Sequence, residues 1–194
     1  MGVWLQGTAR LLAVALLGLA ITFAPARVAL APAASSLRFG APHRPLHLPH
    51  LNPGKRCPIS PSHTARWGTD SLQTLTGRGP VYLIGEGTIS IALSARDSLG
   101  WQGQKTPWAI RRPYEGPILV RGARIGRRGQ MRFAYGYGDH LRELRWDAGA
   151  DQGLPPDPDF RFLASETLFR APGCYAFQID GTSFSKVIVV RVAG

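Results

Sequence analysis

The sequence predicts an all-β fold, a single antiparallel β-sandwich of the immunoglobulin-like type, with a small β-barrel as the alternative. Three observations support this prediction. Apolar and polar residues alternate with a period of two, and turn-rich segments separate the candidate strands at intervals of about 8–12 residues. Beyond the N-terminal region, no stretch keeps a helical apolar stripe for three turns. With 44% hydrophobic and 18% charged residues, the 194-residue chain is suited to one well-buried domain.

The first region, residues 1–33, is typical of a secretory signal peptide. Arg10 precedes an apolar run over residues 11–24, and small residues suited to a signal peptidase follow. The alternative is an uncleaved membrane anchor, although a membrane-spanning helix needs about twenty apolar residues. The sequence therefore predicts a secreted or extracytoplasmic protein, or one held at the membrane by its N-terminus.

The second region, residues 34–63, is rich in proline and predicts an extended linker. Seven of the 16 prolines lie between Pro32 and Pro61, and this stretch shows little apolar periodicity. The β-sandwich domain is expected to cover residues 64–194.

The strands of this domain are expected where the alternation is clearest. The candidate segments are residues 81–85, 88–94, 105–111, 117–124, 130–137, 141–146, 160–169, 174–179 and 184–192. The apolar faces are expected to include Ile89, Ile91 and Leu93 in one strand and Met131, Phe133, Tyr135 and Tyr137 in another.

The last two candidate strands form a terminal hairpin. Its apolar faces consist of Tyr175, Phe177 and Ile179 before the turn and of Ile188, Val190 and Val192 after it. Tyr175 also stands near a Pro-Gly pair at the start of a strand, as in the tyrosine corner of immunoglobulin-like domains.

The two cysteines, Cys57 and Cys174, predict one disulfide, because outside the cytosol such a pair tends to oxidise. The bond would close a loop of 117 residues (174 − 57) and join the start of the domain to its end. The alternative is a catalytic Cys174 in an extracellular enzyme with an unrecognised site, served by His63 or His140 as the base.

The chain has a formal net charge of +11, and residues 96–145 alone carry eleven basic and four acidic side chains, a net of +7 (11 − 4). Basic residues interleaved with aromatics favour contact with anionic surface polymers or lipid headgroups, and an exported protein is not expected to bind nucleic acid. The alternative is a solvated sheet face. The predicted contact residues are Arg111, Arg112, Arg121, Arg124, Arg127 and Arg128.

Motifs of known chemistry are absent from the sequence. There is no G-x-S-x-G, H-E-x-x-H, P-loop or C-x-x-C motif, and no cofactor is expected. His43, His47 and His50 lie close together, but prolines between them prevent helical ligand spacing, so no metal site is expected. A third alternative is a carbohydrate-binding module, which requires Trp101 and Trp108 on the surface.

Three segments resemble a group of uncharacterised exported bacterial proteins. They are a K-x-x-W segment at Lys105 and Trp108, a G-P-x-x-x-R-G strand at Gly116–Gly122, and the ending P-G-C-Y-x-x-Q-x-D-G-T-x-F-S at Pro172–Ser185. The resemblance covers most of the chain from Pro80 onward. It implies a secreted β domain, and because the group has no established activity, it implies no functional residue. The function expected is a non-enzymatic binding or structural module of the cell envelope or extracellular space.

Overall fold

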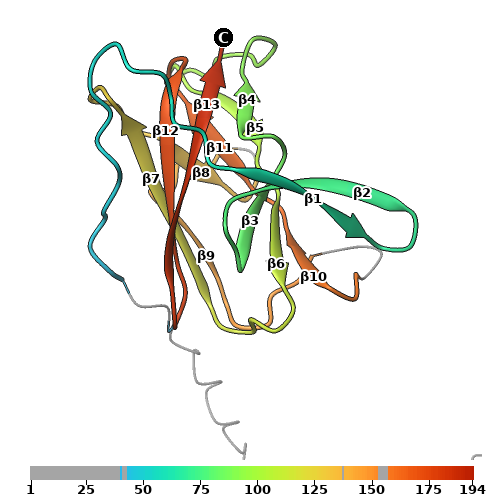
Figure 1. The fold of residues 1–194 in the computed structure, drawn as a ribbon. Helices are drawn as coiled ribbons and strands as arrows, with labels where there is room; N and C mark the ends of the chain where they lie inside the picture. Colours follow the sequence, from blue (N-terminus) through green and yellow to red (C-terminus); the bar gives the residue numbers. More distant parts are fainter. Residues whose placement is uncertain (1–39, 41–42, 137, 153–156) are drawn as a thin grey trace, which may run out of the picture. The chain divides into compact units, whose positions relative to one another are not determined.

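Thirteen β-strands and no helix occur within the residues that the computed structural model describes, which are 40, 43–136, 138–152 and 157–194 (Figure 1). The predicted signal segment, residues 1–33, lies outside this part of the chain. Within the described part, no helix has the length and apolar character needed to cross a membrane. The all-β class predicted from the alternation is confirmed.

The strands follow one another along the whole described chain. They are β1 (Ser62–Trp67), β2 (Ser71–Thr76), β3 (Val81–Ile84), β4 (Thr88–Ser90), β5 (Gln102–Lys105), β6 (Trp108–Arg111), β7 (Ile118–Ile125), β8 (Arg132–Ala134), β9 (Glu143–Trp146), β10 (Phe160–Leu163), β11 (Glu166–Phe169), β12 (Gly173–Asp180) and β13 (Ser185–Ala193).

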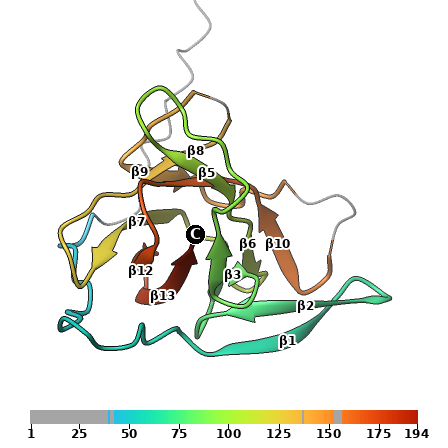
Figure 2. The ribbon, with the colours of Figure 1, turned by 90° about the horizontal axis from the view of Figure 1, so that it is seen from above.

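These strands form three sheets. The first sheet has the order β1-β2-β3-β6-β10, and the second has the order β4-β13-β12-β7-β9. Figure 2 shows β3, β6 and β10 opposite β7, β12 and β13, with β5 and β8 across one end. Those two strands belong to the third sheet, β5-β11-β8. Every strand pair is antiparallel except β4 with β13, which is parallel and lies at the edge of the second sheet.

Two segments predicted as single strands each break in the middle and pass between sheets. Residues 105–111 break at Thr106–Pro107 into β5 and β6, and residues 160–169 break at Ala164–Ser165 into β10 and β11. Pro107 has no N–H for a sheet ladder, which favours a break there. The two breaks lie together, because Thr106 N donates to Ser165 O over 2.9 Å.

The main core lies between the first and second sheets. Trp108 of β6 is fully buried, and its ring meets that of Phe177 of β12 edge to face at 5.3 Å. The predicted apolar faces of the terminal hairpin are all buried in this core. Tyr175 Oη donates to Ala171 O over 2.8 Å, which is the upstream backbone contact of a tyrosine corner.

Two predicted strands are shorter than their alternation suggests. β4 ends at Ser90, so Ile91 is buried but Leu93 is 99% exposed. β8 ends at Ala134, so Phe133 is buried while Tyr135 is 46% exposed. Conversely, the β1–β2 hairpin was not predicted, because its exposed polar residues give little alternation.

Candidate anion-binding groove

Residues 43–61, which we call the N-terminal strap, lie along the outer face of β7, β12 and β13 (Figure 1). Leu48 and Leu51 pack with Ala176 and Val189, whose side chains leave the sheet on the face opposite the main core. Ser60 N donates to Val189 O over 3.0 Å. These residues fall within the predicted linker, 34–63, yet the strap belongs to the same structural unit as the sheets.

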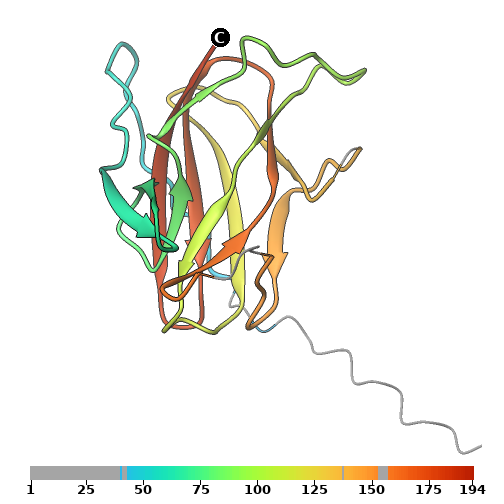
Figure 3. The ribbon, with the colours of Figure 1, turned by 90° about the vertical axis from the view of Figure 1, so that its right-hand side faces the viewer.

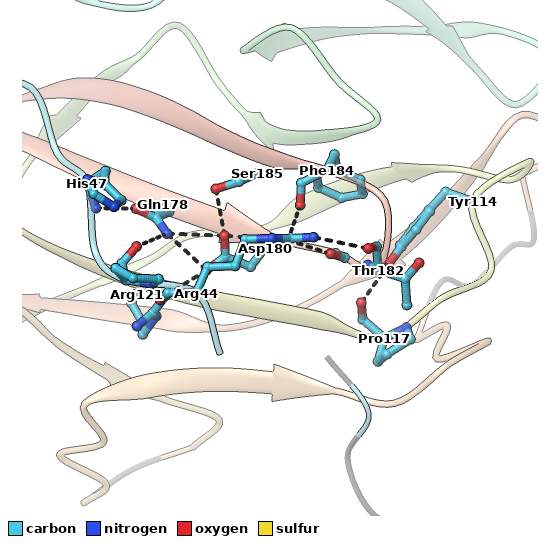
Figure 4. Close-up of polar contacts among 12 residues, drawn as sticks. Arg44, His47, Tyr114, Pro117, Arg121, Gln178, Asp180, Thr182, Phe184 and Ser185 are labelled. Atoms are coloured by element: carbon cyan, nitrogen blue, oxygen red, sulfur yellow. Dashed lines mark hydrogen bonds and ion pairs between the residues drawn. The ribbon is translucent and has the colours of Figure 1, made fainter. Parts of the chain in front are cut away.

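A polar cluster fixes the start of the strap to the β12–β13 turn (Figure 4). The guanidinium of Arg44 donates to the carbonyl oxygens of Gly181, Thr182 and Phe184 over 2.7, 3.0 and 2.6 Å. Thr182 N donates to the phenol oxygen of Tyr114 over 3.0 Å. The carbonyl oxygens of the β12–β13 turn therefore hold Arg44 and, with it, the start of the strap.

Asp180 lies at the centre of this cluster and is completely buried. Its carboxylate accepts hydrogen bonds from Arg121 Nη2 at 2.7 Å, Ser185 Oγ at 2.6 Å and Gln178 Nε2 at 3.1 Å. Arg121 Nη2 also donates to Arg44 O over 2.5 Å. The Arg121 side chain is only 10% exposed and forms a buried ion pair with Asp180. Its guanidinium is therefore not presented on the surface for a ligand.

The predicted disulfide between Cys57 and Cys174 is confirmed, with the two Cα atoms 5.4 Å apart. It fastens the strap to the start of β12. While this bond is intact, Cys174 has no thiolate, so it is not available as the nucleophile of the enzyme alternative.

A groove with a volume of about 1100 Å³ lies beside the disulfide. Strap residues 51–59 form one wall, and the ends of β7 and β13 with the residues that open β12 form the other. The lining residues are Leu51, Asn52, Pro53, Gly54, Lys55, Arg56, Cys57, Ile59, Arg124, Ile125, Gly126, Arg127, Pro172, Gly173, Cys174, Arg191, Val192, Ala193 and Gly194.

The side-chain charge of the groove is entirely positive. Five cations line it, which are Lys55, Arg56, Arg124, Arg127 and Arg191, and no aspartate or glutamate side chain does. All but Arg124 are exposed. None of the five forms an ion pair with another residue in the described part of the chain. Five positively charged residues without an acidic side chain give the lining of the groove a positive electrostatic character.

Arg124 is the most firmly positioned of the five. Its Nη2 donates to Pro172 O over 2.5 Å, and its guanidinium carbon lies 6.0 Å from the centre of the Tyr175 ring. A Cβ atom at position 173 would lie only 2.5 Å from Arg124 Nε, so this arrangement requires Gly173. Burial raises the pKa of the Tyr175 phenol, although the Arg124 charge opposes this shift.

The six arginines predicted as one basic surface lie in several places. Arg124 and Arg127 line the groove, and the exposed Arg128 follows in the same loop. Arg111 ends β6 in the opposite sheet, with its guanidinium carbon 5.1 Å from the centre of the Phe160 ring.

Arg112 follows β6 and has structural partners of its own. Its Nε donates to Asp157 O over 2.6 Å, and its Nη2 lies 3.0 Å from a carboxylate oxygen of Asp151. The structure therefore does not bring the six arginines together, because β6 and β7 belong to different sheets.

The tryptophans of the carbohydrate alternative are buried, Trp101 with 4% and Trp108 with 0% exposure, so they offer no platform for a sugar ring. Of the strap histidines, His43 Nε2 lies 3.5 Å from Glu143 Oε2, and the backbone N–H of His47 donates to Gln178 Oε1 over 2.6 Å. Within the described residues, no three histidine, cysteine, aspartate or glutamate side chains gather as they would around a metal ion.

Three groove cations, Lys55, Arg56 and Arg191, were missed by the sequence prediction. Lys55 and Arg56 directly precede Cys57, and Arg191 pairs with Cys174 across the terminal hairpin. The predicted disulfide joins the residues beside Cys57 to the predicted terminal hairpin, and the register seen in the structure places Arg191 opposite Cys174.

No family model and no curated protein matches the chain. Among solved structures, the chain is similar to the "X-ray Crystal Structure of a Putative Lipoprotein from Bacillus anthracis". The identity is 10%, the match covers 71% of this chain and 86% of that chain, and the TM-score is 0.46.

Proposed function

We propose that the protein is a non-enzymatic, extracytoplasmic binding module whose groove holds a segment of an anionic polymer. The observation that carries this proposal is the convergence of five cations, without an acidic side chain, on one groove of about 1100 Å³. The disulfide supports an oxidising compartment, where polymers with phosphodiester or carboxylate groups are available as partners.

The distribution of the cations favours a polymer over a single small anion. They come from the strap, from the end of β7 and from β13, and four of the five are exposed. A chain of regularly spaced anionic groups can pair with several of them at once, whereas one small anion can contact only neighbouring side chains. Binding of this kind weakens as salt is added, because the Debye length falls from about 10 Å at 0.1 M to about 3 Å at 1 M ionic strength.

The double variant Lys55→Gln/Arg127→Gln tests the groove. Both side chains are exposed, so the fold is expected to remain intact. Each cation near an anionic surface contributes about 1 kcal/mol, so affinity is expected to fall about tenfold or more at low salt. Titration calorimetry with poly(glycerol phosphate) and with polygalacturonate measures the affinity and distinguishes phosphate from carboxylate ligands.

A matched control removes two exposed arginines from the first sheet, Arg66→Gln/Arg111→Gln, and changes the net charge by the same amount. This control is expected to bind nearly as the wild type does. Equal losses in the two double variants would mean that total charge, and not the groove, attracts the polymer. Absence of binding to either polymer at low salt would refute the proposed function.

A further inference from the structure

The loop between β4 and β5, residues 91–101, exposes two leucines to solvent. Leu93 is 99% exposed and Leu99 is 58% exposed. Figure 3 shows this loop extending away from the sheets, above the loop that connects β8 to β9. The alternation of residues 88–94 predicted that Leu93 would be buried. In the structure no sheet packs against its side chain, which is exposed to solvent.

Hydrogen bonds hold this loop in one conformation. Gln102 Nε2 donates to Ile91 O over 3.0 Å and to Ser94 O over 2.8 Å. The Asp97 carboxylate accepts from Leu99 N at 2.9 Å and Trp101 N at 2.8 Å. The two leucines therefore lie on a loop that hydrogen bonds already order. Binding a partner through this loop costs little further conformational entropy.

His140, in the β8–β9 connection, joins the two loops. Its Nε2 lies 2.7 Å from Asp97 Oδ2. Hydrogen bonds from Trp101 N, His140 and Leu99 N lower the pKa of Asp97 and outweigh desolvation, which acts in the opposite direction. The carboxylate of the loop therefore holds the two loops together through His140, and it forms no ion pair with an arginine of the described residues.

Four arginines surround the base of the loop. Arg170 and Arg132 place their guanidinium carbons 4.4 and 5.7 Å from the centre of the Trp101 ring. Arg96 Nη1 donates to Arg170 O over 3.1 Å. Arg142 is close enough to Arg132 to repel its charge, and this repulsion adds to desolvation in lowering the pKa of Arg132.

The positive charge of this cluster exceeds the negative charge beside it. The two loops hold two arginines, Arg96 and Arg142, and two acidic residues, Asp97 and Asp139. Arg132 of β8 and Arg170 after β11 add two further positive charges. None of the four arginines forms an ion pair with a carboxylate of the described residues. Exposed apolar side chains next to unneutralised cations are the combination that binds an anionic bilayer surface.

We propose that the β4–β5 loop docks the protein on an anionic phospholipid bilayer, with Leu93 and Leu99 entering the interface and the arginines around Trp101 contacting the headgroup phosphates. This surface is separate from the groove, because none of its residues lines that groove. The inference is therefore independent of the proposed polymer binding. Leu72 is 70% exposed on β2 of the first sheet, where it pairs with Arg66 of β1, and it serves as a comparison on a different surface.

Co-sedimentation with vesicles tests this inference, using phosphatidylcholine alone and phosphatidylcholine mixed with phosphatidylglycerol. The full chain is used throughout, so any contribution from residues 1–39 is the same in every variant. Wild-type protein is expected to prefer the anionic vesicles. Leu93→Ser/Leu99→Ser is expected to weaken binding about tenfold or more, because each leucine loses its apolar burial in the interface. Arg142→Gln/Arg170→Gln is expected to remove the preference for anionic lipid.

Two controls separate the loop from other surfaces. Leu72→Ser is expected to bind vesicles as the wild type does, and Leu93→Ser/Leu99→Ser is expected to bind soluble anionic polymer normally. The inference is overturned if the leucine variant binds anionic vesicles as well as the wild type does. It is also overturned if the groove variant Lys55→Gln/Arg127→Gln loses all binding to anionic vesicles. Because both leucines are exposed, we expect the Leu93→Ser/Leu99→Ser variant to fold as the wild type does.

Discussion

Replacing Asp180 with alanine is expected to lower the free energy of unfolding by about 3–5 kcal/mol, because it leaves the buried Arg121 guanidinium without its counter-ion. Asp180 is completely buried, and its carboxylate accepts hydrogen bonds from three side chains. Equilibrium denaturation by urea measures the loss. A loss below about 1 kcal/mol, the size of one ordinary hydrogen bond, would contradict this account of the cluster.

Two further variants distinguish the ion pair from its surroundings. Ser185→Ala removes one hydrogen bond to Asp180 and is expected to cost about 1 kcal/mol. The double variant Arg121→Met/Asp180→Leu removes both charges together and is expected to recover much of the stability lost in Asp180→Ala. If the double variant is less stable than Asp180→Ala, the penalty does not come from an unpaired charge.

Removing the disulfide is expected to have a comparable effect. The double variant Cys57→Ser/Cys174→Ser is expected to lose about 2–5 kcal/mol of unfolding free energy, because the bond closes a long loop and restricts the unfolded chain. The variant also releases one wall of the groove, since Cys57 belongs to the strap. Urea denaturation measures the stability, and calorimetry with poly(glycerol phosphate) measures the accompanying loss of affinity.

The wild-type protein treated with a reductant provides the matched comparison for this variant. Reduced wild type and Cys57→Ser/Cys174→Ser are expected to show the same stability and the same reduced affinity. Unchanged polymer affinity after the bond is lost would show that the strap is held by its other contacts alone. An unfolding free energy equal to that of the oxidised protein would contradict the role given to the bond.

The clearest sequence patterns predicted the parts of the fold that depend on local alternation and on covalent chemistry. In the terminal hairpin, residues 174–179 and 184–192 each have one continuous apolar face, and the structure buries both faces. The disulfide was predicted from the presence of only two cysteines in a chain for which export was expected. Both features are fixed by residues close in sequence or by a unique partner.

Other parts depend on long-range contacts that alternation does not encode. Leu93 continues the pattern of Ile89 and Ile91, but β4 pairs with β13 only as far as Ser90. The strap has the composition of a linker, yet Arg44 finds its partners more than 130 residues away, in the β12–β13 turn. Proline content predicted an extended linker and could not predict that residues of this segment pack on the sheet.

The spatial grouping of the basic residues also depends on long-range contacts. Counting charge along residues 96–145 grouped Arg111 with Arg124, although these residues belong to opposite sheets. The groove instead combines Arg124 and Arg127 with cations that adjoin the two cysteines. Sheet order and the position of the disulfide, rather than local charge density, decide which basic side chains meet.

Hydrogen–deuterium exchange of the full chain with poly(glycerol phosphate) at low salt tests the groove most directly. Bound polymer is expected to slow amide exchange in residues 51–59, 124–127 and 191–194 and to leave the β6 amides, which precede Arg112, unchanged. The same protection should be missing in Lys55→Gln/Arg127→Gln. Protection centred on β6, or spread evenly over the molecule, would contradict the assignment of the groove as the polymer-binding site.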